Sequence, residues 1–207
     1  MGKEAMFKIT YGLFVLTAKE GEKHNGCIVN TVMQVTETPN KVSVTVNKKN
    51  HTHDMIMRTG SFTASVISED AKFELFRHFG FSSGRDTDKF ADYTAARLTK
   101  NGTMAVLDGT NAYIAARVTD TVDLGTHTLF IAEVEEAETL SATPSATYAF
   151  YHANIKPKPE EKKEESAKKT VWRCTVCGYE EEAEELPDDF VCPLCNHGKD
   201  FFEKVAK

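Results

Sequence analysis

The sequence predicts a mainly β domain with short helices, consistent with a barrel, followed by a small metal-binding module. Most segments up to residue 138 are short, rich in β-branched residues and bounded by turn residues. Four of the five cysteines lie beyond residue 170. A run of Lys, Pro and Glu separates the two regions. We therefore expect domains at residues 1–155 and 170–207, joined by a linker at 156–169.

The expected strands share an apolar or alternating pattern and a turn signal at their ends. Residues 41–47, KVSVTVN, alternate strictly, which places three valines on one face. The turn signals are Gly21, Asn25-Gly26 and Thr38-Pro39-Asn40. Strands are expected at residues 7–18, 27–36, 41–47, 61–67, 103–108, 111–121 and 128–138.

Helices are expected at three places between these strands. Asn50 or Thr52 can cap a short helix that Gly60 ends. Residues 70–79 carry phenylalanines at helical spacing, which we interpret as core packing. Residues 86–92 are expected to form one more helical turn.

Composition and charge exclude several classes of protein. The chain has 207 residues and a net charge of −6, without the basic patch that a nucleic-acid partner requires. It contains no apolar run long enough for a membrane helix. The N-terminal segment lacks an apolar signal core, so we expect a cytoplasmic protein. Residues 170–207 hold 4 basic and 9 acidic residues. This charge favours a partner with a basic docking surface, or serves solubility alone.

The cysteines of the second module form two pairs, Cys174-x-x-Cys177 and Cys192-x-x-Cys195. A two-residue spacer lets a tight turn point both thiolates to one side, and two such knuckles give a tetrahedral set of four sulfurs. Paired cysteines in a chain without a signal segment favour a metal over disulfides. Four thiolates suit either iron or zinc, so the residues alone leave the metal open.

The second module resembles the rubredoxin family. The matching segments are Cys174-Thr-Val-Cys177-Gly178-Tyr179, Leu186-Pro187-Asp188-Asp189-Phe190-Val191-Cys192-Pro193-Leu194-Cys195 and Gly198-Lys199-Asp200-x-Phe202. The resemblance implies one iron ion that cycles between ferric and ferrous states. The loop between the cysteine pairs is shorter than in free-standing rubredoxins. We expect a small aromatic core made by Trp172, Tyr179, Phe190, Phe201 and Phe202.

In the β domain, polar residues gather at strand ends and in loops, at 30–31, 47–52 and 82–85. Arg and Lys with nearby hydroxyl groups and a helix start suit a phosphate, although ordinary loops have similar composition. The sequence contains no catalytic triad signature, P-loop or G-x-G-x-x-G motif.

Residues 5–155 resemble the flavin reductase-like family, a split β-barrel that binds FMN. The matching segments include Asn25–Thr31, Val46–Lys48 with Thr52, Gly80–Asp86, His127–Val134 and Tyr148–His152. The resemblance implies a homodimer with FMN near the subunit interface. It places Asn30, Thr31 and Val32 along the flavin ring. It assigns the ribityl chain and phosphate to Asn47, Lys48, Thr52, Ser83, Gly84, Arg85 and Lys89.

The combination resembles the high-molecular-weight rubredoxins. It implies that NADH or NADPH delivers a hydride to FMN, and that single electrons then reach iron and a redox partner such as a flavodiiron oxygen or nitric oxide reductase. By the same resemblance, His127 is a candidate catalytic residue near the nicotinamide or flavin.

Two alternatives remain open at this stage. One is a free flavin reductase that releases reduced FMN, with a structural zinc ion in the C-terminal module. The other is a non-catalytic FMN-binding electron carrier that a protein donor reduces. Colour distinguishes the free flavin reductase from the iron-containing protein, because zinc bound by thiolates is colourless. Direct oxidation of NADH distinguishes the non-catalytic carrier from an enzyme.

Overall fold

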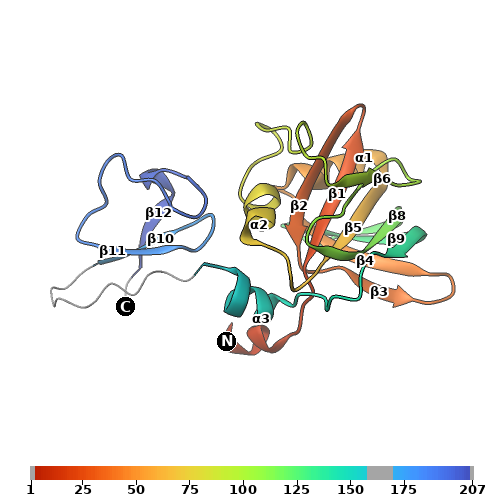
Figure 1. The fold of residues 1–207 in the computed structure, drawn as a ribbon, viewed down its shortest axis with the longest axis horizontal. Helices are drawn as coiled ribbons and strands as arrows, with labels where there is room; N and C mark the ends of the chain where they lie inside the picture. The colour runs from red at the N-terminus through yellow and green to blue at the C-terminus, as the bar shows by residue number, and fades with distance from the viewer. Residues whose placement is uncertain (1–2, 158–169, 206–207) are drawn as a thin grey trace. The chain divides into compact units, whose positions relative to one another are not determined.

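The computed structural model describes residues 3–157 and 170–205 of the chain (Figure 1). The chain divides into two compact units, Met1–Ile155 and Lys156–Lys207. Residues 158–169, most of the predicted linker, lie outside the described residues. Among the residues described, no helix is long and apolar enough to cross a membrane.

The larger unit is built on one seven-stranded antiparallel sheet. Its strands are β1 (Phe14–Glu20), β2 (Lys23–Val29), β3 (Met33–Thr36), β4 (Lys41–Asn47), β5 (Ser61–Ile67), β8 (Thr110–Asp123) and β9 (His127–Thr139). The order across the sheet is β2-β1-β5-β8-β9-β4-β3. The two edge strands, β2 and β3, are therefore neighbours in the sequence.

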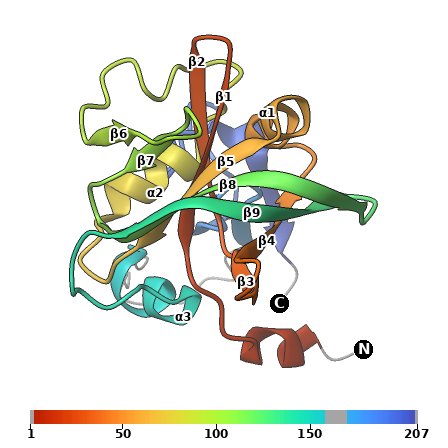
Figure 2. The same ribbon diagram turned by 90° about the vertical axis from the view of Figure 1, so that its right-hand side faces the viewer.

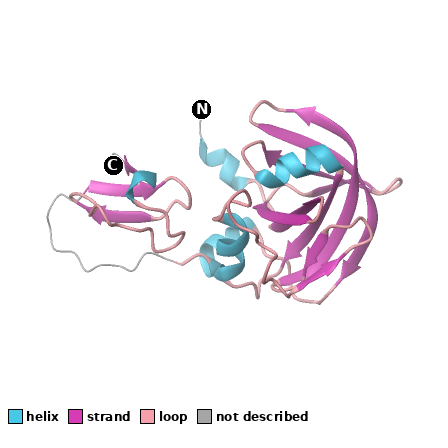
Figure 3. Ribbon diagram, turned by 90° about the horizontal axis from the view of Figure 1, so that it is seen from above, coloured by secondary structure: helices cyan, strands magenta, loops and turns pink. Residues whose placement is uncertain are grey.

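This connectivity explains why the sheet curves. Only residues 30–32 join the two edge strands, so the edges cannot lie a full sheet width apart. Thr31 fastens this connection to β4, because its Oγ1 donates to the carbonyl of Thr45 at 2.7 Å. The twisted strands curl into a barrel that is not closed by hydrogen bonds between β2 and β3 (Figures 2 and 3). The predicted mainly β fold with a split barrel is confirmed.

The barrel core follows the alternation seen in the sequence. Val42, Val44 and Val46 of β4 are buried, as predicted, in a cluster with Phe62 and Phe130. The predicted helix is α1 (His51–Thr59), which begins after Asn50 and ends at Gly60 in a left-handed conformation, φ 68°. It packs against β1 and β2, and its Met55 and Ile56 complete the cluster.

A second cluster lies on the other side of β1. Helix α2 (Phe73–Gly80) packs against β2 and buries Leu75, Phe76 and Phe79 with Val15 and Ile67. The predicted core role of this helix is confirmed. The short strands β6 (Ala96–Leu98) and β7 (Met104–Val106) form a separate pair, and α3 (Tyr148–Phe150) continues into a short π-helix, Tyr151–Ile155.

Four local predictions for the larger unit were wrong. Residues Lys3–Lys8 form a 3-10 helix, so the first strand starts at Phe14. The predicted strand 27–36 is interrupted at 30–32, and residues 86–92 form turns without a helix. Asn25-Gly26 lies inside β2 and makes no turn. The reason is tertiary packing, because a Cβ at Gly26 would lie 2.9 Å from Phe79 Cδ1.

The smaller unit has a three-stranded antiparallel sheet with the order β11-β10-β12. Its strands are β10 (Thr170–Cys174), β11 (Glu180–Ala183) and β12 (Phe202–Val205), and a 3-10 turn covers Lys199–Phe201. Its buried residues are Val171, Leu186 and the four cysteines. The predicted aromatic core is confirmed only in part. Trp172, Tyr179, Phe190 and Phe202 are partly buried, and the rings of Phe190 and Phe202 pack edge to face at 5.2 Å, whereas Phe201 is 45% exposed. The four cysteines are more deeply buried than these rings.

Candidate functional site

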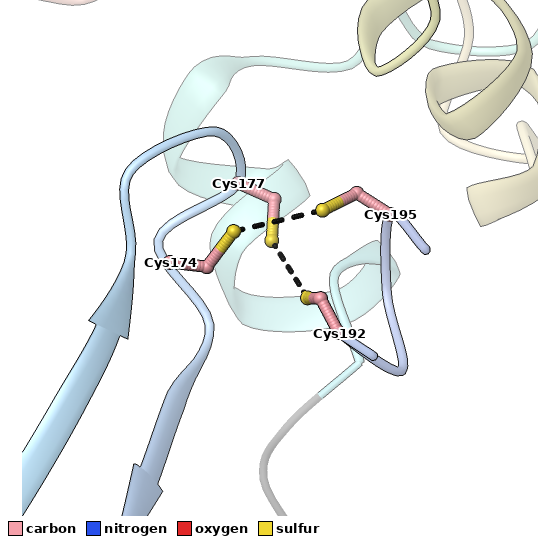
Figure 4. Close-up of side chains that lie close together, drawn as sticks. All are labelled: Cys174, Cys177, Cys192 and Cys195. Carbon is pink, nitrogen blue, oxygen red and sulfur yellow. Dashed lines mark hydrogen bonds between the residues drawn. The ribbon is translucent and has the colours of Figure 1, made fainter. Parts of the chain in front are cut away.

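The first cysteine knuckle is a tight turn at the end of β10. The N–H of Gly178 donates to the carbonyl of Cys174 at 2.9 Å, and the N–H of Cys174 donates to the carbonyl of Tyr179 at 2.8 Å. Gly178 adopts φ 72°, a left-handed conformation that suits glycine. The turn places the side chains of Cys174 and Cys177 on one side (Figure 4).

The second knuckle repeats this geometry. The N–H of Asn196 donates to the carbonyl of Cys192 at 2.9 Å, and the N–H of Cys192 donates to the carbonyl of His197 at 2.8 Å. Here Asn196 takes the left-handed position, with φ 58°, which asparagine tolerates better than most residues. Nδ1 of His197 lies 3.0 Å from the carbonyl oxygen of Cys195, so its ring is tied to the knuckle.

The two knuckles bring four sulfur atoms together, as Figure 4 shows. Cys174 Sγ lies 3.6 Å from Cys195 Sγ, and Cys177 Sγ lies 3.5 Å from Cys192 Sγ. All four ligand atoms lie within 4.8 Å of one another, and all four cysteines are free of disulfides. A tetrahedron of sulfurs around one ion at about 2.3 Å has edges of about 3.8 Å, so the donor set fits one metal ion.

Backbone N–H groups surround these sulfurs. Those of Val176 and Cys177 reach Cys174 Sγ, that of Tyr179 reaches Cys177 Sγ, and that of His197 reaches Cys195 Sγ. Hydrogen bonds to coordinated thiolates stabilise their charge and shift the reduction potential of an iron centre. The donor set is therefore suited to iron.

The predicted flavin-ring segment, Asn30 to Val32, lies beside β4. Thr31 holds it there, since its Oγ1 donates to the carbonyl of Thr45 and accepts from the N–H of Thr45 at 3.1 Å. Val32 also lines an apolar cavity of about 310 Å³. The other lining residues are Phe14, Met33, Gln34, Asn40, Val42, Ile114, Val134 and Ala137.

Three further predicted residues meet where β4 ends and β9 begins. Asn47 pairs with His127 across these strands. Asn47 Oδ1 accepts the N–H of Lys49 at 2.9 Å, which shapes the turn into α1. The ammonium of Lys48 lies 2.6 Å from Asp123, and Nδ1 of His127 lies 2.9 Å from Thr126 Oγ1. Both His127 and Lys48 are partly exposed at this edge.

The predicted phosphate residues gather at the N-terminal end of α1. Arg85 donates to Asp54 Oδ2 at 2.7 Å and lies 3.4 Å from His51 Nδ1. Ser83 Oγ accepts the N–H of Arg85 at 3.2 Å. The bond from Arg85 holds the pKa of Asp54 below its usual value. Burial, together with the positive charge of Arg85, lowers the pKa of His51.

Thr52 and Gly84 belong to the same end of α1 but are buried. Thr52 Oγ1 accepts a hydrogen bond from Asn25 Nδ2 at 2.9 Å. Gly84 lies so close to Asn25 that a Cβ at position 84 would overlap the side-chain amide. The structure thus links Thr52, Asn25 and the segment that carries Arg85.

Lys89 lies apart from these side chains. It is 3% exposed, and its ammonium donates to the carbonyls of Gly26 at 2.8 Å and Phe79 at 2.9 Å. Burial lowers the pKa of Lys89 to about 8. These contacts make Lys89 an anchor of the loop that follows α2.

Sequence reasoning missed two residues of this site. The only sequence signal for Asp54 was an acidic residue in the first turn of a helix. Asn25 was assigned to a turn, although it lies in β2. Asn25 Oδ1 is buried and has no hydrogen-bond partner among the described residues. The structure thus brings the start of α1, the guanidinium of Arg85 and the loop that carries Ser83 together on one side of β2, and backbone N–H groups at a helix start and a guanidinium are groups that bind anions in proteins.

Comparisons with known proteins agree with both parts of the chain. Residues 6–158 match the model of the flavin reductase like domain, and residues 172–203 match the rubrerythrin, rubredoxin-like domain. The chain is 35% identical to a high molecular weight rubredoxin of Moorella thermoacetica, over 99% of this chain and 100% of that protein. It is 37% identical to a ferric-chelate reductase (NAD(P)H) of Archaeoglobus fulgidus, over 76% of this chain and 93% of that protein.

A solved structure has the same fold as the larger unit. It is an NADH:FAD oxidoreductase of Streptomyces globisporus, with a TM-score of 0.63 and 21% sequence identity. The match covers 77% of this chain and 92% of that one.

Proposed function

Because the chain belongs to the flavin reductase-like family and carries a rubredoxin-like domain, as the high-molecular-weight rubredoxins do, we propose that it passes electrons from NAD(P)H through FMN and iron to a flavodiiron protein. It is an NAD(P)H-linked flavin oxidoreductase. The observation that carries the proposal is the tetrahedral four-cysteine set in the same chain as a flavin reductase barrel.

Bound FMN supplies the step from two-electron to one-electron chemistry, because flavin accepts a hydride and gives electrons up singly. The chain's task is to hold the cofactors and to orient them. Asn30, Thr31 and Val32 would lie along the flavin ring, where the bonds between Thr31 and β4 fix the backbone. The apolar cavity at Val32 offers a surface that excludes water from the ring.

The phosphate would bind at the N-terminal end of α1. The side chain of Arg85 is half exposed there, so its guanidinium can contact a ligand in competition with Asp54. Ser83, with Asn47 and Lys48 from the turn before the helix, would complete the polar contacts to ribityl and phosphate. His127, opposite Asn47, lies at the same edge of the barrel and is the candidate to contact the nicotinamide.

At the metal site, the four cysteines would hold iron, and the backbone N–H groups around them would stabilise the thiolate charge. Val176 and Val191 beside the knuckles are exposed, so an acceptor can come close to the sulfurs. The acidic residues of the smaller unit favour an acceptor with a basic docking face, which is a property we assign to the flavodiiron partner.

We further propose that the barrel forms a homodimer. Large apolar side chains are exposed at β3 and at the β8–β9 turn, namely Met33, Val35, Val122 and Leu124. Apolar surface of this kind is what a permanent subunit interface covers. A second copy would then cover the edge at which the flavin-ring segment lies.

The test is anaerobic stopped-flow absorbance of the protein loaded with FMN and iron, after mixing with NADH. We expect the flavin band to bleach first and the red ferric-thiolate bands to follow at a rate independent of protein concentration. If the flavin is reduced while the thiolate bands are absent or never respond, the chain is a free flavin reductase with a structural metal. If NADH leaves the flavin oxidised, it is a carrier that another protein reduces.

A further inference from the structure

Asn25 occupies a buried position between two elements of the proposed phosphate site. It sits in β2, is 2% exposed, and donates through Nδ2 to Thr52 Oγ1 of α1 at 2.9 Å. Its Oδ1 has no hydrogen-bond partner among the residues that the structure describes. A buried amide with one unpaired oxygen costs stability, so its presence here points to a role beyond packing.

The other face of the Asn25 side chain touches the loop that carries Ser83 and Arg85. Gly84 is buried against it, and a Cβ at this position would overlap Asn25 Oδ1. The loop can approach β2 this closely only because residue 84 is glycine. A second contact five residues later ties the same loop to the same strand, from Lys89 Nζ to the carbonyl of Gly26.

Thr52 is fully buried, with 0% of its surface exposed. Its hydroxyl offers no surface to a ligand, whereas Ser83 and Arg85 are exposed. The contacts of Thr52 therefore point to support of the site rather than to direct binding. The hydrogen bond from Asn25 fixes the first turn of α1 against the loop.

We propose that Asn25 is a positioning residue for the flavin phosphate, acting through Thr52 and Gly84. It sets the distance between the start of α1 and the guanidinium of Arg85, so that a phosphate monoester fits between them. This inference rests on the proposed FMN site and assigns to it a support on β2. It predicts that substitution of Asn25 weakens binding of the FMN phosphate and leaves binding of the isoalloxazine ring unchanged.

The experiment titrates the full-length protein, stripped of flavin, with FMN and with riboflavin, which lacks the phosphate. Asn25→Ala removes the hydrogen bond to Thr52 and the contact with Gly84, and is expected to lower FMN affinity about 10-fold and riboflavin affinity less than about 2-fold. Gly84→Ala should weaken FMN binding in the same way. In the double variant the added methyl group no longer meets an amide, so the loss should equal that of Asn25→Ala alone.

Asn111 provides a matched control in β8. It is also buried, donates through Nδ2 to the carbonyl of Thr143 and to Ser145 Oγ, and leaves its Oδ1 without a partner among the described residues. Asn111→Ala should lower the melting temperature and leave the ratio of FMN to riboflavin affinity unchanged. If Asn25→Ala does not fold, Thr52→Val removes the same hydrogen bond from the other side with little change of shape.

Equal losses of FMN and riboflavin affinity in the Asn25 or Thr52 variant would show a general structural role and overturn the inference. So would additive losses in the double variant. If the wild-type protein binds FMN no better than riboflavin, the phosphate site itself is misplaced and the inference fails with it. If the preference for FMN over riboflavin is unchanged in Asn25→Ala and in Thr52→Val, Asn25 has no positioning role, but the proposed phosphate site is not contradicted.

Discussion

The two units of this chain are held together by different forces. The barrel buries many large apolar side chains completely, among them Leu16, Val44, Phe62 and Phe130. In the smaller unit, Val171 and Leu186 are the only buried aliphatic side chains among its described residues, and the other buried residues are the cysteines. Apolar burial thus accounts for the stability of the first unit and cannot do so for the second.

This difference shows what each unit contributes to electron transfer. The barrel is a scaffold for the proposed flavin site, whose residues come from β2, the turn after β4, α1 and the loop after α2. The smaller unit brings its functional atoms to its centre, so that its metal site and its core are one. Changes at the metal site should therefore unfold it, whereas changes at the flavin site should leave the barrel folded.

The largest expected effect is loss of the metal site through Cys177→Ser. One of four sulfur ligands disappears, and metal binding in such small modules supplies about 10 kcal/mol or more of folding free energy. We expect loss of the visible thiolate bands and rapid proteolysis of residues 170–207, with flavin reduction by NADH retained. The measurement is absorbance together with limited proteolysis and mass spectrometry.

Chelation of the metal from the wild-type protein should give the same cleavage pattern without a mutation. A substitution at the buried Cys27 of the barrel, Cys27→Ser, is the matched control and should leave the thiolate bands in place. Loss of flavin reduction in Cys177→Ser would mean that the two units are not independent. It would contradict the conclusion that each unit is stabilised separately.

The reverse experiment removes a core side chain of the barrel. Phe62 is 0% exposed, and truncation of such a residue to alanine costs about 3–5 kcal/mol. Phe62→Ala should lower the unfolding midpoint of the barrel while the metal bands stay unchanged. Phe201→Ala in the smaller unit should cost about 1 kcal/mol or less, because that ring is 45% exposed. Differential scanning calorimetry on both variants distinguishes the two transitions.

Local signals predicted the parts of the fold that depend on neighbours in sequence. Strict alternation predicted β4, Gly60 predicted the end of α1, and of the two candidate caps Asn50 and Thr52 the structure has Asn50 at its start. The Asn25-Gly26 pair misled because its usual role in turns was overridden by packing against Phe79. The sequence of β2 alone cannot show that the ring of Phe79, on α2, packs against Gly26.

The same distinction holds for the two sites. Each metal knuckle is complete within a few residues, so the sequence from Cys174 to Tyr179 is enough to predict a turn that carries two ligands. The contacts that support the proposed flavin site are not local in the sequence. Asn25 and Thr52 are 27 residues apart, and Asp54 and Arg85 are 31 apart, and only the barrel brings them together.

An intermediate effect is expected from Lys89, which anchors the loop after α2. Its pKa is lowered by burial from 10.5 to about 8, so between these values the unfolded chain binds more protons than the folded one. Stability should therefore rise with pH across this window, by about 3 kcal/mol. Comparison of urea unfolding of the wild type with Lys89→Met from pH 7 upward isolates this contribution.

Lys89→Met should lack that rise, and it should also be less stable at pH 10 because two carbonyl groups lose their donor. Parallel curves for the two proteins would show that the ammonium is solvated in solution. The loop would then have no buried cation holding it to β2.

The smallest expected effect concerns Asp54, which in the proposed site would compete with the FMN phosphate for Arg85. The two side chains form a partly exposed pair at 2.7 Å, and such pairs are worth about 0.2–1 kcal/mol. Asp54→Asn should therefore raise FMN affinity about 2- to 5-fold, since it frees the guanidinium and removes a negative charge beside the phosphate. It should also destabilise α1 slightly, because an acidic residue in the first turn is favourable.

Arg85→Ala provides the background that makes this small effect informative. Alone it should weaken FMN binding about 10-fold, as expected for a charge-assisted contact, and leave riboflavin binding unchanged. With Arg85 absent, Asp54→Asn should gain less than in the wild type, because no guanidinium remains to be released. A decrease of FMN affinity in Asp54→Asn would reverse the assignment: Asp54 would then orient Arg85 toward the phosphate, and the pair would be part of the site rather than its competitor.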